Sequence, residues 1–329
     1  MKSVDRKLLA IREGRYTPDD FILADAKDAD MAWGVAAPGP RRPDDAPAGG
    51  RRFRTRAEFL EAMRAIVRQG EQDVLLASAS NAERLAREGL FEGCPVTLAV
   101  RANDATDIWG PRGGAYRLEP SRPFRSASLE AVRPFCDLGL YSLTFNNQLA
   151  ADLASLEAYA RFRAEAARLG FRHFLEVFNP NAPAGLAHAE LPQFVNDSIA
   201  RALAGVTEAE RPLFLKVAYN GPAAMEELAG HDPTLVVGVL GGAAGTTRDC
   251  YELLAQAERH GARVALFGRK INLAEAPLEL VALMRPVLRR ELTPEGAVRA
   301  YHAALAKRAI RPVRPLEDDV QISEPVLRA

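Results

Sequence analysis

Short apolar segments alternate with longer amphipathic segments along most of this chain. The apolar segments are bounded by Gly, Pro, Asn and charged residues, which is typical of strands buried on both faces. The segments between them repeat their apolar residues at helical spacing, and some stop at a glycine such as Gly170 or Gly261. The pattern predicts strands at residues 21–25, 74–78, 95–100, 140–145, 174–178, 214–219, 236–240 and 264–267.

Helices are predicted after the strands and at both ends of the chain. The expected ranges are 3–13, 57–70, 81–88 with Asn81 as N-cap, 128–136, 151–169, 193–203, 222–229, 246–260, 276–289 and 294–307, with an irregular tail from Pro312. Strands that alternate with helices are expected to be parallel and joined by right-handed crossovers.

Eight strand–helix units in roughly 250–300 residues predict an α/β fold of the (β/α)₈ TIM-barrel type. We expect one domain over residues 1–329, with a barrel core at about 20–290 and a C-terminal tail at 310–329. The alternative is a doubly wound open sheet, although no G-x-G-x-x-G motif follows the first strand. The polar, Pro- and Gly-rich segment 36–56 in the first βα loop is a candidate lid.

Composition narrows the function classes. The 329 residues include 43 acidic and 43 basic side chains, so the net charge is zero and favours neither nucleic acid nor an anionic membrane as a partner. The sequence contains no signal-like apolar core and no apolar run of membrane-spanning length, which predicts a cytoplasmic protein. Three scattered cysteines form neither a disulfide framework nor a zinc motif. We expect no metal and no cofactor, and a homo-oligomer is left open.

The segment Phe214–Tyr219 is apolar or aromatic except for Lys216 at its centre. Burying a lysine costs several kcal/mol unless its charge is paired or removed. Glu176 is centred in the preceding apolar segment in the same way. Two interpretations follow: a structural ion pair between these residues, or an amine nucleophile with a proton-transfer group beside it.

In a barrel of this type, the active site lies at the carboxyl ends of the strands. Polar residues at those ends are therefore candidate site residues, with Asp25 as a second carboxylate and the rest as substrate-binding groups. They are Asp25, Arg101, Asn146, Asn179 and Asn220. For each asparagine the structural alternative is that it simply ends a strand, because Asn tolerates turns.

A phosphate-binding pattern follows the last two predicted strands. Gly241 and Gly242 precede a helix, whose first N–H groups are suited to bind an anion. Gly268 and Arg269 end the eighth strand, where backbone can approach a phosphate closely and the guanidinium can bind it. Many barrels place a phosphate site after strands seven and eight.

In this order, the motifs Leu23-Ala-Asp25, Phe174-Leu-Glu176, Leu215-Lys-Val217, Gly241-Gly242 and Gly268-Arg269 resemble the class I aldolase superfamily of deoxyribose-phosphate, fructose-bisphosphate and tagatose-bisphosphate aldolases. The resemblance implies that Lys216 forms a Schiff base, that Asp25 and Glu176 contact substrate or move protons, and that the glycines with Arg269 bind phosphate. Relatives place His or Gln after the first-strand aspartate and a Lys or Tyr on the fourth strand. This chain has Ala26 there, and Tyr141, Ser142 and Thr144 on the fourth strand.

These features predict a metal-independent aldolase that makes or breaks a carbon–carbon bond in a small phosphorylated carbonyl compound. The departures on the first and fourth strands leave the substrate open. Two alternatives remain: a phosphosugar isomerase or epimerase that uses Glu176 as its base, and a non-catalytic phosphometabolite-binding protein.

Overall fold

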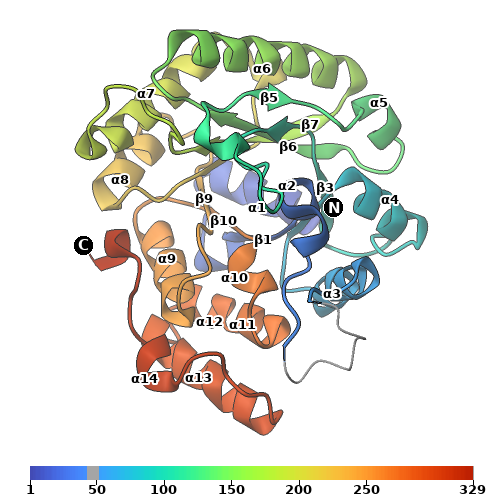
Figure 1. Cartoon of the computed structure of the whole chain (residues 1–329), viewed down its shortest axis with the longest axis vertical. Helices are drawn as coiled ribbons and strands as arrows, with labels where there is room; N and C mark the ends of the chain where they lie inside the picture. The colour runs from blue at the N-terminus through green and yellow to red at the C-terminus, as the bar shows by residue number, and fades with distance from the viewer. Residues whose placement is uncertain (43–51, 329) are drawn as a thin grey trace.

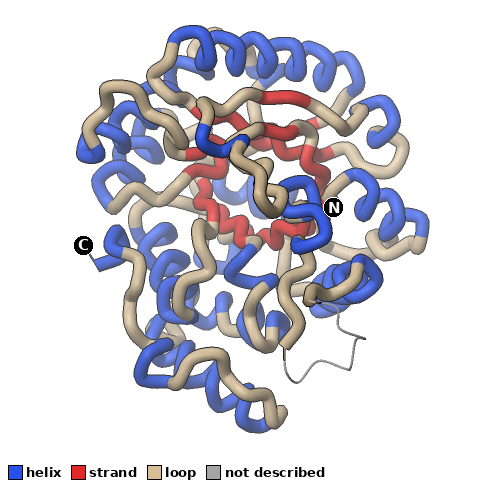
Figure 2. Tube along the Cα trace, viewed as in Figure 1, coloured by secondary structure: helices blue, strands red, loops and turns tan. Residues whose placement is uncertain are grey.

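Eight parallel strands close into a barrel in the computed structural model, which describes residues 1–42 and 52–328. The ring is visible at the centre of Figure 2, and its strand order is β1-β10-β9-β8-β7-β6-β3-β2. The predicted TIM barrel is confirmed, and the open-sheet alternative is wrong. The ring strands are β1 (Ile22–Lys27), β2 (Val74–Ala77), β3 (Thr97–Arg101), β6 (Leu138–Thr144), β7 (Arg172–Phe178), β8 (Leu215–Val217), β9 (Gly238–Leu240) and β10 (Val264–Phe267). A separate antiparallel pair, β4 (Asp104–Ala105) and β5 (Pro123–Phe124), lies in the connection from β3 to β6.

Helices surround the ring (Figure 1). They are α1 (Ser3–Arg12), α2 (Asp30–Trp33), α3 (Arg56–Gln69), α4 (Ala79–Arg87), α5 (Leu129–Val132), α6 (Leu149–Leu169), α7 (Leu191–Leu203), α8 (Pro222–His231), α9 (Thr247–Arg259), α10 (Arg269–Asn272), α11 (Pro277–Ala282), α12 (Met284–Leu288), α13 (Pro294–Lys307) and α14 (Leu316–Asp319). None of the helices in the described ranges is both long and apolar enough to cross a membrane.

Three local predictions are wrong. Ser78 is the N-cap of α4, and Asn81 lies inside that helix. The helix expected at 276–289 is divided into α11 and α12, because Pro286 has no N–H to donate to the carbonyl of Ala282. The tail expected to be irregular forms α14 and a 3₁₀ turn at Pro325–Arg328, where Leu327 is buried.

Strand alternation divides the buried side chains into two sets. One set fills the barrel interior and includes Ile22, Ala24, Leu140, Phe174 and Phe214. The other set packs between the strands and the surrounding helices. Because successive strand residues point to opposite faces, a polar residue enters the barrel only if it shares the parity of the interior set.

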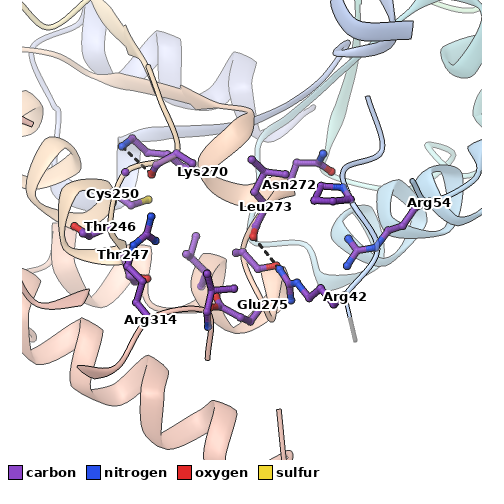
Figure 3. A pocket seen from close by; sticks show the side chains of 16 residues that line it. Arg42, Arg54, Thr246, Thr247, Cys250, Lys270, Asn272, Leu273, Glu275 and Arg314 are labelled. Atoms are coloured by element: carbon purple, nitrogen blue, oxygen red, sulfur yellow. Dashed lines mark hydrogen bonds between the residues drawn. The ribbon is translucent and has the colours of Figure 1, made fainter. Parts of the chain in front are cut away.

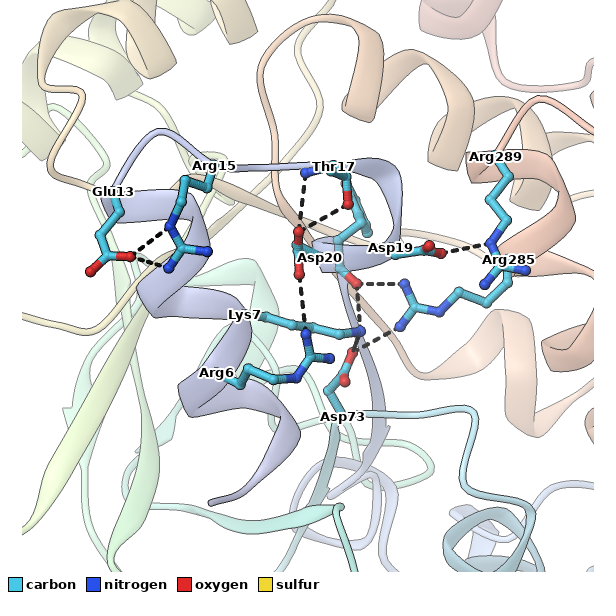
Figure 4. Close-up of polar contacts among 11 residues, drawn as sticks. Arg6, Lys7, Glu13, Arg15, Thr17, Asp19, Asp20, Asp73, Arg285 and Arg289 are labelled. Carbon is cyan, nitrogen blue, oxygen red and sulfur yellow. Dashed lines mark hydrogen bonds and ion pairs between the residues drawn. The ribbon is translucent and has the colours of Figure 1, made fainter.

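Helix α1 closes the amino end of the barrel, where Val4 and Leu8 pack against the interior set. A buried polar cluster holds it there (Figure 4). Asp73 accepts hydrogen bonds from Lys7 Nζ at 2.8 Å and from Arg285 Nη2 at 3.0 Å. Both cations also donate to the carbonyl of Phe21, so the cluster joins α1 and α12 to the first two strands.

His173 on β7 is buried against α6, where its Nε2 lies 2.9 Å from the hydroxyl of Tyr159. Burial lowers the pKa of His173 from 6.5 to about 3, and the charge of Arg163 adds to the effect. The folded protein therefore binds fewer protons at this site than the unfolded chain between pH 3 and 6.5.

We expect this difference to destabilise the fold in acid. The contribution of His173 is fully present above pH 6.5 and is lost as the pH falls towards 3, reaching about 2 kcal/mol of lost unfolding free energy at pH 5. Urea unfolding at pH 5 and pH 7.5 measures it. The His173→Gln variant should lack this part of the pH dependence, whereas a variant of the exposed His188, His188→Gln, should keep it. An equal pH dependence in wild type and His173→Gln would contradict the assignment.

Candidate active site

A cavity of about 540 Å³ opens at the carboxyl ends of the barrel strands. It is lined by eight of the predicted site residues: Arg101, Glu176, Asn179, Lys216, Gly241, Gly242, Gly268 and Arg269. Three predicted residues, Asp25, Asn146 and Asn220, do not line it. Five lining residues that were not predicted add chemistry to the cavity: Asp28, Trp33, Asp107, Arg117 and Asn181.

Lys216 and Glu176 form the centre of the site. They are direct partners in the register of β8 and β7 and share the parity of the interior residues Phe214 and Phe174. Lys216 Nζ lies 2.5 Å from Glu176 Oε1, and the two side chains are 7% and 1% exposed. Each charge therefore compensates the burial of the other, and the carboxylate lies where it can exchange a proton with the amine.

Arg101 at the end of β3 holds this pair in place. Its Nη2 donates to Glu176 Oε2 at 3.1 Å, and its Nη1 donates to the hydroxyl of Ser142 at 2.8 Å. Ser142 in turn donates to Glu176 Oε2 at 2.7 Å. The third donor of the guanidinium, Nε, binds Asp28. Because each of its three nitrogens donates to a group of the protein, we interpret Arg101 as a positioning residue rather than the substrate-binding group that the sequence suggested.

Asp28 is the aspartate that the first βα connection places at the cavity. Burial tends to raise the pKa of this carboxyl, but the charges of Arg101 and Lys216 outweigh burial and hold it below its ordinary value of 3.8. Asp28 is therefore an ionised carboxylate within reach of the lysine charge. Asp28 has the same parity as the interior residues Ala24 and Ala26, so its side chain is expected on the cavity side. The sequence could predict this only if the first strand were known to continue to Lys27.

Asp25 does not join the site. The prediction that it ends the first strand is wrong, because β1 continues to Lys27. Its parity is that of Leu23, so its carboxylate lies between the barrel and the helices, fully buried, with Asp25 Oδ2 2.9 Å from Lys27 Nζ. Burial raises the pKa of Asp25, and the nearby charge of Lys27 opposes this shift.

The three predicted asparagines mainly connect loops. Asn146 accepts a hydrogen bond from the N–H of Ala182 and donates its own N–H to Asp152, both at 2.8 Å. Asn179 and Asn220 donate to each other's side-chain oxygens at 2.8 and 2.9 Å. Asn179 alone of these three lines the cavity, so the strand-end alternative fits Asn146 and Asn220.

One corner of the cavity is cationic. Gly241 and Gly242 follow β9, Gly268 follows β10, and Arg269 starts α10. A side chain at position 268 would place a Cβ 3.0 Å from the carbonyl oxygen of Ala26, a tight contact that glycine avoids. The guanidinium of Arg269 makes no hydrogen bond or ion pair with residues 1–42 or 52–328. Its pKa is lowered by burial and by the nearby charge of Arg117, while the charge of Glu324 opposes the shift. Two cations, Arg269 and Arg117, therefore lie near this corner.

The predicted anion site at the start of the following long helix, α9, is wrong. Thr246 N donates to Asp249 Oδ2, and Thr247 N donates to Asp319 Oδ1, each at 2.8 Å. Carboxylates of the protein therefore already occupy this helix end. The corner formed by Gly241, Gly242, Gly268 and Arg269 is the phosphate-binding candidate that remains.

Figure 3 shows a second pocket, of about 310 Å³, which shares the lining residues Pro40, Asn272 and Leu273 with the first. Its basic side chains include Arg42, Lys270 and Arg314. Arg42 donates to the carbonyls of Leu273 and Ala274, and Lys270 is paired with Glu324 at 2.8 Å. Since Arg42 and Lys270 bind groups of the protein, this pocket has a weaker claim to a substrate than the barrel mouth.

Part of the predicted lid lies outside the described residues, namely 43–51. The flanking residues approach each other, since Arg41 N donates to Arg52 O and Arg54 N donates to Gly39 O. Ala36, Gly39 and Pro40 line the cavity. The lid function stays a prediction.

The fold and site define a TIM barrel with a buried lysine–glutamate pair and a cationic corner at its mouth. Solved structures with this fold include fructose-bisphosphate aldolases. An archaeal fructose 1,6-bisphosphate aldolase is 16% identical over 87% of this chain and 99% of its own, with a TM-score of 0.61. A Schiff-base-forming fructose-1,6-bisphosphate aldolase gives 0.62 at the same identity and coverage. The fructose-bisphosphate aldolase of Slackia heliotrinireducens gives 0.65 at 14% identity, over 92% of this chain and 90% of its own. No protein-family model and no curated sequence matches this chain.

The different roles of the two arginines lead to a stability prediction. Arg101→Met leaves Asp28 and Glu176 without their guanidinium, so the free energy of unfolding should fall by about 3–5 kcal/mol. Arg269→Met, the matched control, removes a guanidinium that makes no hydrogen bond or ion pair with residues 1–42 or 52–328, and should change the free energy of unfolding by no more than about 0.5 kcal/mol. Urea unfolding of both variants measures the difference. An Arg101→Met protein as stable as wild type would show that the network does not depend on Arg101.

Proposed function

We propose that this protein is an aldolase that makes or breaks a carbon–carbon bond in a phosphorylated carbonyl compound through a Schiff base on Lys216. The observation that carries the proposal is the Lys216–Glu176 pair, which presents an amine and a carboxylate 2.5 Å apart inside the substrate-sized cavity. The fold shared with fructose-bisphosphate aldolases supports the proposal as an analogy of fold.

The first half of the reaction takes place at Lys216. Its amine, after losing a proton to Glu176, attacks the substrate carbonyl carbon to form a carbinolamine. The carbinolamine oxygen then leaves as water, with a proton returned by Glu176, and a protonated imine remains. This imine accepts the electron pair of the breaking carbon–carbon bond, which lowers the barrier to cleavage. The enamine formed in this way takes up a proton on carbon and becomes an imine again. Hydrolysis of that imine releases the second product and regenerates the amine.

The corner with Gly241, Gly242, Gly268 and Arg269 supports a phosphorylated substrate. A phosphate there would meet backbone at glycines and the guanidinium of Arg269, with the charge of Arg117 nearby. The corner belongs to β9 and β10, adjacent to β8 with Lys216. A phosphate bound at the corner would therefore lie next to the strand that carries the amine.

The first test is covalent trapping. Borohydride reduction with dihydroxyacetone phosphate, glyceraldehyde 3-phosphate or fructose 1,6-bisphosphate should leave an adduct on Lys216, detected by intact mass and peptide mapping. The adduct should be absent in Lys216→Met and Lys216→Arg, and cleavage activity should fall in both by at least about 10⁴-fold. Chelator should leave activity unchanged if the reaction is metal-independent.

A protein that turns over phosphosugars while giving no adduct, and keeps its activity in Lys216→Arg, would favour the isomerase or epimerase alternative. Binding of the same compounds without adduct or turnover would favour the phosphometabolite-binding alternative. Either outcome would make Lys216 a structural partner of Glu176.

A second prediction addresses the phosphate. Arg269→Met should weaken binding of dihydroxyacetone phosphate by about 10–100-fold, because it removes a charged hydrogen-bond donor. It should leave the weaker trapping of unphosphorylated dihydroxyacetone within about twofold of wild type. The comparison of half-saturating concentrations for the two ketones measures this. Equal losses for both ketones would mean that Arg269 acts on something other than the phosphate.

A further inference from the structure

The fourth barrel strand, β6, presents no lysine or tyrosine to the cavity, but it holds a carboxylate there. Asp107, in the connection from β3 to β6, lines the cavity. Its Oδ2 accepts a hydrogen bond from the hydroxyl of Thr144 at the end of β6, and its Oδ1 accepts one from Ser121 at 2.9 Å. Both carboxylate oxygens are thereby fixed in orientation by neutral hydroxyl groups.

The environment of Asp107 differs from that of the other carboxylates at the mouth. Asp28 and Glu176 each form an ion pair with Arg101, and Glu176 also pairs with Lys216. In the described parts of the chain, Asp107 makes no ion pair. Burial raises the pKa of Asp107 above its ordinary value, the hydrogen bonds of Thr144 and Ser121 oppose the shift, and the negative charge of Glu176 adds to it. A carboxyl group with a raised pKa is a stronger base when ionised than an ordinary aspartate, which suits it to accept a proton from a substrate.

The topology places Asp107 on the opposite side of Lys216 from the phosphate corner. The strand order β10-β9-β8-β7-β6 puts the corner on β10 and β9, Lys216 on β8, and the Thr144 anchor of Asp107 on β6. Neighbouring strands lie about 4.8 Å apart, so the cavity spans roughly 10 Å between β8 and β6. A substrate with its phosphate at the corner and its carbonyl carbon at Lys216 would extend its remaining carbons towards Asp107.

We propose that Asp107 is the general base that takes the proton from the substrate hydroxyl when the carbon–carbon bond breaks. This inference rests on the proposed aldolase function. The hydroxyl proton moves to Asp107, the oxygen electron pair forms the new aldehyde carbonyl, and the electron pair of the broken bond passes to the imine to give an enamine. In the synthetic direction, the carboxylic acid of Asp107 returns the proton to the aldehyde oxygen. Glu176 remains with the proton transfers at the lysine nitrogen.

The test separates bond cleavage from imine formation. The substrate for this test is whichever of the three phosphorylated compounds both forms the adduct with wild type and is cleaved by it. With this compound, Asp107→Asn should still form the borohydride-reducible adduct on Lys216, while cleavage falls by about 10²–10⁴-fold. Asp107→Glu should recover part of the activity. The control is Asp104→Asn in the same connection. Asp104 binds Ser126 and does not line the cavity, so this variant should cleave at the wild-type rate.

The pH profile provides a second readout that leaves the carboxylate intact. The rise of kcat/KM on the acid side should follow the pKa of Asp107, because the base must be ionised. Thr144→Val removes a hydrogen bond that lowers this pKa, so the rise should move to higher pH. This rise of kcat/KM on the acid side should disappear in Asp107→Asn.

Wild-type cleavage rates in Asp107→Asn, or an unmoved acid limb in Thr144→Val, would overturn the inference while leaving the Schiff-base proposal intact. Loss of adduct formation together with cleavage in Asp107→Asn would also overturn it, because the residue would then act in folding or binding. Failure of wild type itself to form an adduct would instead refute the proposed function on which the inference rests.

Discussion

The structure of this site depends on the buried ion pair between Lys216 and Glu176. Neither charge could be placed inside the barrel alone without a large desolvation cost. The pair does not stand alone either, since Arg101 and Asp28 extend it into a cluster of two cations and two carboxylates. Because the cluster has no net charge and its members donate and accept hydrogen bonds among themselves, the interior can hold ionised groups. The contacts that stabilise these strands also orient the amine within reach of a carboxylate.

Strand parity decides which polar residues take part in that cluster. Glu176 and Lys216 are register partners on neighbouring strands with interior parity, so they meet. Asp25 and Asp28 are three residues apart and therefore differ in parity, which sends Asp25 to the helix side and leaves Asp28 at the mouth. Asp25, which its sequence motif suggested as a site residue, therefore points to the helix-facing side of β1 and not into the cavity.

The sequence predicted most where local pattern and global fold agree. Apolar runs located all eight ring strands, and the charged residues centred in two of them identified Lys216 and Glu176. It predicted less where a strand end was misjudged, since buried Lys27 in β1 does not resemble a strand residue. Loop residues were missed because their positions follow no strand register. Asp107 and Arg117 reach the cavity only through the folded connection between β3 and β6, and nothing in their local sequence signals this.

The C-terminal segment shows how contacts between distant parts of the chain define a site that local motifs leave ambiguous. Two glycine-containing turns precede helices near the mouth, and either could bind an anion by local pattern alone. At the turn before α9, the N–H of Thr247 donates to the carboxylate of Asp319. Beside this turn, Glu324 forms an ion pair with Lys270. An added phosphate at that helix end would have to displace a carboxylate already in place, whereas within residues 1–42 and 52–328 the guanidinium of Arg269 has no hydrogen-bond or ion-pair partner. The tail thus makes the corner beside Lys216 the more favourable place for a phosphate, at a position from which the bound carbonyl can reach the amine.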